Sequence, residues 1–197
     1  MGSRHLVYQF TYSRAKNASR VHWHHEESPV LLRDAVELLN GFGRALDIGC
    51  GTGTDSIFMA KRGLNVTAVD FIARALEFAK MRAKEYGVEI CFIQADVTEL
   101  ELKGKFDLVF DSGCLHSFDE KTRLRYKSRL LEMMSPQSHY VLIHAGKADM
   151  LDFGIGPRPR TKEQIETFFM PELKLVDFRS ETAGKPFCQY RFVRCGN

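Results

Sequence analysis

Short apolar runs alternate along this chain with longer segments whose apolar residues recur at helical spacing. Strands that alternate with helices predict a doubly wound α/β sheet that is mostly parallel and has helices on both faces. No helical segment separates the last two expected strands, so we expect an antiparallel hairpin and one antiparallel edge strand in a seven-stranded sheet. The expected strands are 45–49, 65–70, 89–96, 105–111, 138–145, 173–181 and 186–195, and the expected helices are 30–40, 54–63, 72–87, 119–136 and 161–169.

The composition fits one globular domain preceded by a short arm. The 197 residues are 44% hydrophobic, which is enough for an ordinary core. Residues 1–28 lack clear periodicity and are expected to form an N-terminal arm or lid, with residues 29–197 as a single domain. The five cysteines lack C-x-x-C spacing, which favours a reducing compartment. Without a membrane-length apolar stretch or a signal-peptide pattern, the protein is expected to be cytoplasmic.

The stretch "ALDIGCGTGTDSIFMAKRG" places alternating glycines between an apolar run and a helical segment. Gly49, Gly51 and Gly53 form a loop that lets a ligand approach the backbone closely. It is not a Walker A loop, because it lacks the Gly-Lys-Ser/Thr ending, and Thr54 stands where a dinucleotide fingerprint would have its third glycine. Asp47 precedes the loop and no basic residue lies inside it. An anionic pyrophosphate is therefore a poor ligand, and a cationic ligand is a better one.

Two further acids follow the next expected strands. Asp70 ends "TAVD", where a carboxylate accepts hydrogen bonds from a ribose diol. Asp96 ends "IQAD", where it and the backbone N–H of Val97 are placed to meet an adenine ring. Simpler interpretations are a tight turn for the glycines, a helix cap for Asp70 and a turn residue for Asp96. Their order along the chain favours a nucleoside that carries a positive charge and no phosphates.

These motifs resemble those of class I S-adenosylmethionine-dependent methyltransferases. The similar stretches are "LDIGCGTG", "VTAVD", "FIQADV" and "FDLVFDSGCLHSF", within residues 45–145. The resemblance implies a Rossmann-like fold, S-adenosyl-L-methionine as cofactor and S-adenosyl-L-homocysteine as product. It implies that the glycines hold the methionyl part, Asp70 the ribose, and Asp96 with Val97 the adenine. The residues expected to bind the cofactor are Asp47, Gly49, Cys50, Gly51, Gly53, Asp70, Phe71, Asp96, Val97 and Asp111.

The stretch "FDSGCLHSF" lies beside the transferred methyl group in this family. His116 is the expected catalytic base, because a histidine accepts a proton near neutral pH. Asp111 is the second expected catalytic residue, which either orients the loop or contacts the substrate. The alternatives for His116 are that it caps the next helix or only lines the pocket. The stretch is not the [DN]-P-P-[YF] motif of amino-methylating nucleic-acid enzymes.

The arm contains a second cluster, "RVHWHHEESP", whose Trp23 is expected to close over the pocket. Its histidines suggest a metal, but His24 and His25 are adjacent and point to opposite sides of an extended chain. We therefore expect no metal and a solvated or substrate-contacting arm. The stretch "HWHHEESPVLL" loosely resembles a segment of thiol and thiopurine methyltransferases. The residues expected to contact the substrate are Trp23, His25, Cys114, His116, Phe153 and Arg158.

The predicted activity is methyl transfer from S-adenosylmethionine to a small-molecule acceptor. A thiol or another soft nucleophile is favoured, with nitrogen and oxygen as alternatives. The other functions left open are an RNA- or protein-directed methyltransferase and a non-catalytic cofactor-binding partner subunit. A net charge of +3 is too small to indicate nucleic-acid binding, so neither nucleic acid nor a membrane is an expected partner. The protein is expected to be a monomer or homodimer.

Overall fold

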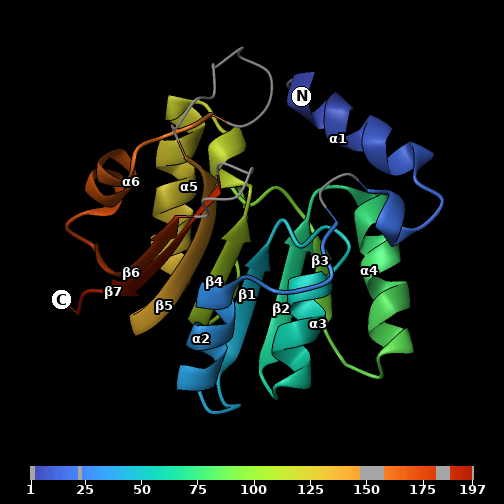
Figure 1. The fold of residues 1–197 in the computed structure, drawn as a ribbon, viewed down its shortest axis with the longest axis horizontal. Helices are drawn as coiled ribbons and strands as arrows, with labels where there is room; N and C mark the ends of the chain where they lie inside the picture. The colour runs from blue at the N-terminus through green and yellow to red at the C-terminus, as the bar shows by residue number, and fades with distance from the viewer. Residues whose placement is uncertain (1–2, 22–23, 147–157, 181–186, 197) are drawn as a thin grey trace.

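Seven strands of the computed structural model form one sheet, with helices packed on both of its faces (Figure 1). The structure describes residues 3–21, 24–146, 158–180 and 187–196. The helices are α1 (Ser3–Arg14), α2 (Val30–Leu38), α3 (Thr54–Lys61), α4 (Ala73–Glu85), α5 (Glu120–Met133) and α6 (Lys162–Phe169), with short 3-10 helices η1 (Ala18–Arg20) and η2 (Leu115–Ser117). The strands are β1 (Arg44–Ile48), β2 (Asn65–Asp70), β3 (Cys91–Gln94), β4 (Phe106–Ser112), β5 (Met134–Ala145), β6 (Leu173–Ser180) and β7 (Phe187–Arg194).

The strand order is β3-β2-β1-β4-β5-β7-β6, which confirms the expected fold class. β1 pairs parallel with both β2 and β4, so the order along the sheet reverses beside β1. Ligands of doubly wound sheets bind at this point, outside the carboxyl ends of the strands. The antiparallel strand is β7, which pairs with β5 and with β6. It lies one strand in from the edge, and β6 forms the edge itself.

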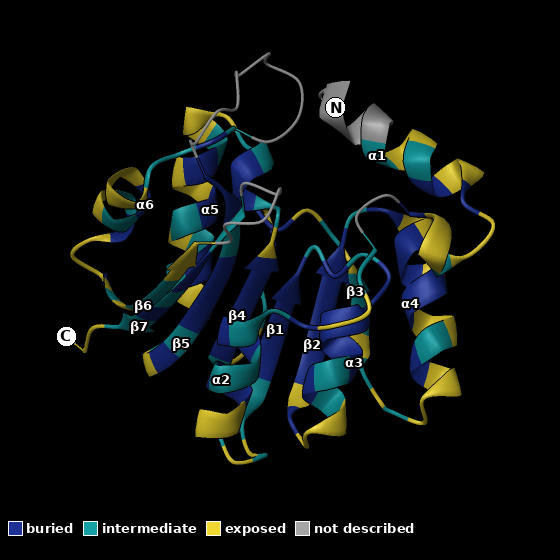
Figure 2. Cartoon of the chain, viewed as in Figure 1, coloured by how far each residue is buried: buried dark blue, intermediate teal, exposed yellow. Residues whose placement is uncertain are grey.

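Neighbouring residues of each strand point to opposite faces and therefore contribute to separate cores. In β1, Leu46 packs in a cluster with residues of α5 and α6. Ala45 packs instead in a cluster with residues of α2 and α3. Figure 2 shows the central strands as a continuous buried layer between these helices. This burial makes the sheet a rigid support for the loops at its carboxyl edge.

Side-chain caps define the starts of two helices. Before α6, the Thr161 side chain accepts from the Gln164 backbone N–H, and the Gln164 side chain accepts from the Thr161 N–H. The two hydrogen bonds together form a capping box. Asp119 caps α5 by accepting a hydrogen bond from the backbone N–H of Thr122 at 2.8 Å.

The fifth strand begins earlier than expected. The chain passes from α5 directly into β5 at Met134, although the sequence indicates a strand only from residue 138. Pro136 cannot continue a helix, and its fixed φ suits an extended strand. Met134 pairs with Phe106, and the register then shifts before Leu108. An irregularity in the ladder therefore accommodates the residues that the sequence assigns to the end of the helix.

The N-terminal arm contains a helix that the sequence does not predict. α1 spans Ser3–Arg14 and lies beside α4 (Figure 1). Tyr12 and Val21 of the arm are buried in a cluster with Ile72 and Phe78, which begin and line α4. Packing against α4, rather than a regular apolar stripe, therefore stabilises this segment.

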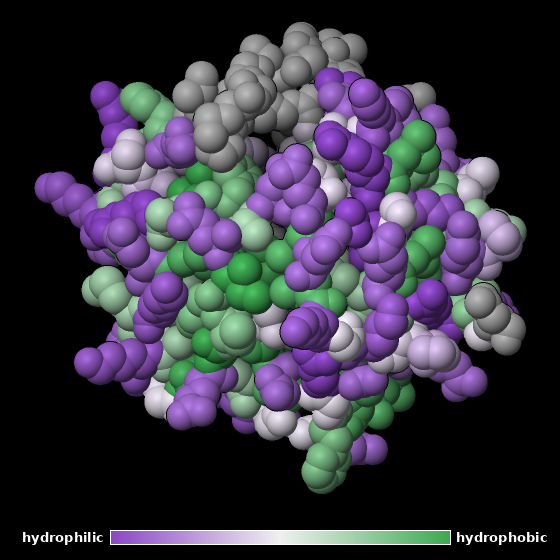
Figure 3. Space-filling view, turned by 180° about the vertical axis from the view of Figure 1, so that it is seen from behind, coloured by the Kyte–Doolittle hydropathy of each residue, from purple (hydrophilic) through white to green (hydrophobic). Residues whose placement is uncertain are grey.

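No helix in the described part of the chain combines the length and the apolar character that crossing a bilayer demands. Seen from behind, the molecule carries hydrophilic side chains over most of its surface, with hydrophobic residues gathered near the middle of that face (Figure 3). Exposed apolar residues of this kind are common on globular proteins.

Candidate functional site

The glycine loop joins β1 to α3 at the carboxyl edge of the sheet. Gly49, Gly51 and Gly53 have φ angles of 69°, 55° and 78°, a conformation that strains other residues. The Gly49 N–H donates to the backbone carbonyl of residue 69 in β2 at 2.7 Å. A Cβ atom at Gly49 would lie 2.5 Å from Cys114 Sγ, and one at Gly51 would lie 2.9 Å from the Tyr12 hydroxyl. The loop therefore requires glycine both for its backbone and for its neighbours.

Asp70, at the end of β2, is in direct contact with this loop. Its Oδ2 accepts from the Gly51 N–H at 2.9 Å, and its Oδ1 accepts from the Ile72 N–H at 2.8 Å. Burial raises the pKa of Asp70 to about 6. A backbone hydrogen bond from Phe71 also helps to hold the carboxylate and lowers its pKa slightly. Asp70 thus holds the turn that leads into α4 without capping the helix itself, whose N-cap is Ile72, and its expected contact with a ribose stays a prediction.

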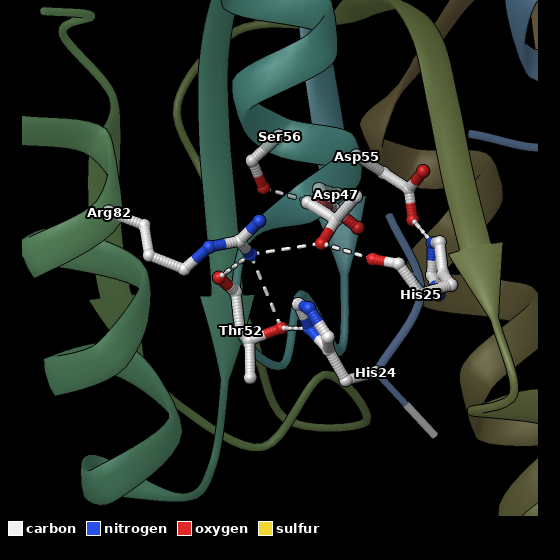
Figure 4. A network of polar contacts seen from close by, with 8 residues as sticks. His24, His25, Asp47, Thr52, Asp55, Ser56 and Arg82 are labelled. Carbon is white, nitrogen blue, oxygen red and sulfur yellow. Dashed lines mark hydrogen bonds and ion pairs between the residues drawn. The ribbon is translucent and has the colours of Figure 1, made fainter. Parts of the chain in front are cut away.

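Asp47, at the end of β1, lies in a buried network beside the loop (Figure 4). It accepts a hydrogen bond from the Ser56 hydroxyl of α3. The pKa of Asp47 is raised to about 8, mainly by burial and to a smaller extent by the nearby carboxylates of Asp55 and Asp70. A positive charge that entered this region would favour the ionised carboxylate and lower the pKa again.

Residues 24–29, here called the crossing segment, run across the start of α3 and are tied to it. His24 Nδ1 lies 2.9 Å from Thr52 Oγ1, and His25 Nε2 lies 2.9 Å from Asp55 Oδ2. Figure 4 shows Arg82 reaching the same loop from the side opposite His25. Its guanidinium donates to the Thr52 carbonyl oxygen at 2.7 Å. The arm is therefore coupled to the glycine loop by polar contacts as well as by packing.

His25, expected at the substrate, is thus placed against Asp55 in the structure. Burial and the Arg82 guanidinium lower the pKa of His24, which favours the neutral form of this neighbouring ring. Within the described residues, no three His, Cys, Asp or Glu side chains are grouped so that they could hold a metal ion.

The loop after β4 is held by Asp111, which is completely buried. Its Oδ1 accepts from the Cys114 N–H at 2.7 Å, and its Oδ2 accepts from the Leu115 N–H at 3.1 Å and the Tyr126 hydroxyl at 2.5 Å. Burial raises the pKa of Asp111 to about 6. Of the two roles expected for Asp111, this geometry favours orienting the loop that carries His116.

His116 lies on η2 and is 8% exposed. Its ring centroid lies 5.6 Å from that of His144 and 6.0 Å from that of Phe187. Its carbonyl oxygen accepts from the Arg158 N–H at 2.7 Å, so the expected substrate residue Arg158 meets this loop through its backbone. The cap of α5 is Asp119, so the alternative role of His116 as that cap is wrong.

Asp96 is a turn residue that lies two positions after the end of β3. Its Oδ1 accepts from both the N–H and the hydroxyl of Thr98, each at 2.8 Å, which is the simpler of the interpretations left open. The Val97 side chain is buried in the core beneath. Asp96 nevertheless lies near enough to Cys114 to help raise the pKa of its thiol, after burial and the nearer carboxylates.

The other expected site residues divide into those near the loop and those that are not described. Cys50 is buried within the loop, and its thiol has a pKa raised by burial. Phe71 packs edge-to-face against Tyr8 of the arm, with ring centroids 6.0 Å apart. Trp23 and Phe153 lie outside the described residues.

Several polar residues of the site were not expected from the sequence. Asp55 and Ser56 lie in the first turn of the helix that follows the glycine loop, and this position in the sequence could have indicated that they lie at the site. Arg82 comes from a distant helix, and no local pattern marks it. His144 ends the fifth strand, where its position alone could have indicated a place near the site.

Residues 45–137 match the family model described as "Methyltransferase domain". Over 125 residues the chain is 27% identical to the 2-heptyl-1-hydroxyquinolin-4(1H)-one methyltransferase of Mycobacteroides abscessus. This alignment covers 62% of this chain and 55% of that protein. Over 89 residues it is 39% identical to the ubiquinone biosynthesis O-methyltransferase of Erwinia tasmaniensis, covering 43% of this chain and 37% of that protein. The chain therefore spans about half of the first relative and less of the second.

The fold is also that of a solved methyltransferase. The structure of Burkholderia thailandensis 1,6-didemethyltoxoflavin-N1-methyltransferase, with bound 1,6-didemethyltoxoflavin and S-adenosylhomocysteine, aligns with a TM-score of 0.78 at 20% identity. The alignment covers 100% of this chain and 92% of that one. The expected resemblance to class I S-adenosylmethionine-dependent methyltransferases is confirmed, and it rests on the match of residues 45–137 to the methyltransferase domain model.

Proposed function

We propose that this protein is an S-adenosylmethionine-dependent methyltransferase that acts on a small molecule. The observation that carries the proposal is the contact between the glycine loop and Asp70, beside the buried acid Asp47. Burial raises the pKa of both carboxyl groups, so a cationic ligand that enters would stabilise their ionised forms, whereas an anionic pyrophosphate would not. These two acids beside the glycine loop thus fit a positively charged nucleoside without phosphates.

In this proposal the loop residues Gly49, Gly51 and Gly53 hold the methionyl part of the cofactor. Asp70 holds the ribose, and the turn at Asp96 faces the adenine. When bound, the cofactor supplies a methyl group that its positive sulfur has already activated. Residues 1–28 serve as a lid on the domain formed by residues 29–197, a role supported by the Tyr12 hydroxyl that lies over Gly51.

The chain's own residues position the acceptor and remove its proton. Asp111 fixes the backbone of the loop after β4 through two N–H groups. His116 on that loop accepts the proton that the acceptor loses, as a general base. The rest of the rate enhancement comes from holding the acceptor in line with the methyl group, in a site that excludes water.

The acceptor atom is the finer part of the proposal. The sequence prediction of a thiol acceptor rests on the loose likeness of the arm to thiol and thiopurine methyltransferases. Two proteins similar to this chain are named as O- and N1-methyltransferases, so hydroxyl and N–H groups are equally included here. No described contact favours an RNA, a protein acceptor or a non-catalytic role, and the expected oligomeric state and cytoplasmic location stay predictions.

Calorimetry with four ligands tests the cofactor. We expect binding of S-adenosylmethionine and S-adenosylhomocysteine and none of ATP or NAD. Tight binding of ATP or NAD without either S-adenosyl compound would refute the proposal.

A matched pair of alanine variants locates the binding. Gly51→Ala and Gly87→Ala carry similar backbone strain, because φ is 55° and 66°, a cost of about 1–2 kcal/mol. A Cβ atom at Gly87 meets nothing within 4 Å, whereas one at Gly51 meets Tyr12. We expect Gly51→Ala to weaken S-adenosylhomocysteine binding about tenfold or more, and Gly87→Ala to leave it unchanged. Equal affinities of the two variants would place the cofactor elsewhere.

A further inference from the structure

His144 ends β5 beside the loop that carries His116, and it lies outside the residues matched by the family model. Tyr140 and Leu142 of the same strand pack in the cluster that contains α5, and residues two apart share a face of the sheet. His144 therefore faces the side on which Asp111 bonds Tyr126. It is 0% exposed, and its ring lies edge-to-face with that of His116.

The hydrogen bonding of His144 defines which nitrogen carries its proton. His144 Nδ1 lies 2.8 Å from the backbone oxygen of Ala145. A carbonyl oxygen only accepts, so Nδ1 is the donor. Burial, with a smaller contribution from His116, lowers the pKa of His144 to about 3. The ring is therefore neutral at physiological pH, and Nε2 presents a lone pair.

This lone pair lacks a partner in the described part of the chain. His144 Nε2 is buried and receives no hydrogen bond there. A buried acceptor without a donor costs about 1–3 kcal/mol. Its position at the carboxyl end of a central strand is where a doubly wound sheet binds its ligands. A ligand that supplies an O–H or N–H donor at this point would remove the cost.

We infer that His144 Nε2 accepts a hydrogen bond from the methyl acceptor and so selects acceptors with a hydroxyl or N–H group over thiols. The inference rests on the proposed function and names its substrate class. An S–H group is a weak donor and leaves the acceptor nearly unsatisfied, whereas O–H and N–H groups are strong donors. A site built around such a bond discriminates against analogues that lack the donor. His144 thus selects and orients the acceptor when it binds. A hydroxyl group has a single proton, so it turns from His144 Nε2 to His116 before that base removes the proton, whereas an amino group donates one N–H to each histidine.

Two substitutions separate this role from a packing role. His144→Asn keeps an amide donor near the place of Nδ1 and has no atom near that of Nε2. His144→Gln puts an amide oxygen near the place of Nε2. The probes are phenylmethanol, phenylmethanethiol and ethylbenzene, which have similar shapes and differ in donor strength. Each is titrated by ligand-observed NMR into the full chain saturated with S-adenosylhomocysteine.

In wild type we expect phenylmethanol to bind more tightly than phenylmethanethiol. In His144→Asn, the preference for phenylmethanol over ethylbenzene should fall about tenfold, which corresponds to one hydrogen bond. In His144→Gln it should stay within about threefold of wild type. S-adenosylhomocysteine affinity should be the same in all three proteins.

Three results would overturn the inference. These are an unchanged preference in His144→Asn, an equal loss for phenylmethanol and ethylbenzene, and no binding of any probe by wild type that does bind S-adenosylhomocysteine. Failure to bind S-adenosylhomocysteine would instead refute the proposed function.

Nitrogen-15 NMR of the wild-type ring gives a second test that needs no variant. We expect His144 to be neutral and protonated at Nδ1 from about pH 5 to 8. A charged ring, or a proton on Nε2, would overturn the inference.

Discussion

The Asp111→Asn substitution tests how the loop after β4 is held. Asp111 accepts two backbone N–H groups and the Tyr126 hydroxyl from a completely buried position. Asparagine has nearly the same shape, but only its carbonyl oxygen accepts. With the carbonyl oxygen in the place of Oδ2, the Leu115 and Tyr126 bonds are kept and the Cys114 N–H loses its acceptor, at a cost of about 1–3 kcal/mol to the free energy of unfolding.

The raised pKa makes this cost depend on pH. The pKa of Asp111 is about 6 in the folded protein against an ordinary value of 3.8. The folded protein therefore holds a proton that the unfolded chain has already released. This contribution to stability is complete below about pH 3.8 and is lost as the pH rises through about 6. The full shift corresponds to about 3 kcal/mol, of which about 1.4 kcal/mol is lost between about pH 5 and 7.5.

Urea unfolding of wild type and Asp111→Asn at those two pH values measures the difference. The variant lacks the titrating group, so its deficit relative to wild type should be about 1.4 kcal/mol smaller at the higher pH. Asp47 and Asp70 titrate in both proteins and largely cancel. Tyr126→Phe is the control in the other direction, because it removes a hydrogen bond that lowers the Asp111 pKa, and its stability should fall more steeply with pH. Parallel pH profiles of wild type and Asp111→Asn would refute the reasoning.

Three further substitutions test other contacts. Gly49→Ala should destabilise the fold by about 1–3 kcal/mol in urea unfolding, because a Cβ at Gly49 would lie 2.5 Å from Cys114 Sγ. Adding Cys114→Ala to this variant should restore part of the lost stability. Additive effects of the two substitutions would contradict the clash. His25→Ala should speed hydrogen exchange in the crossing segment by removing the contact with Asp55, and unchanged exchange would mean that the contact does not hold it. His116→Ala should lower kcat about 100-fold or more with little change in the KM for S-adenosylmethionine; a change below about tenfold would leave His116 only lining the pocket.

The fold could be predicted because local patterns and topology agree. The central strands are short apolar runs, and the turn after β1 needs glycine at Gly49, Gly51 and Gly53. Helix α1 could not be predicted in this way. Its stability comes from Tyr12 and its neighbours packing against α4, which lies far along the chain. A contact of that kind leaves no periodic signal in the arm itself.

The site shows the same division. The approach of Asp70 to the glycine loop follows from parallel strands that end at one edge of the sheet. The supporting contacts of Arg82 and Tyr126 come from helices on opposite faces, so sequence spacing does not reveal them. The ring contact between His116 and His144 likewise depends on how η2 folds back over β5.

The position of β7 between β5 and β6 affects the order in which the sheet can assemble during synthesis. β6 has no pairing with β5 and joins the sheet only through β7, which the ribosome makes later. The nascent chain can therefore assemble the strands up to β5 while residues 173–180 wait without a partner. Until residues 187–194 emerge, the unpaired edges of β5 and β6 are where a chaperone would be expected to act.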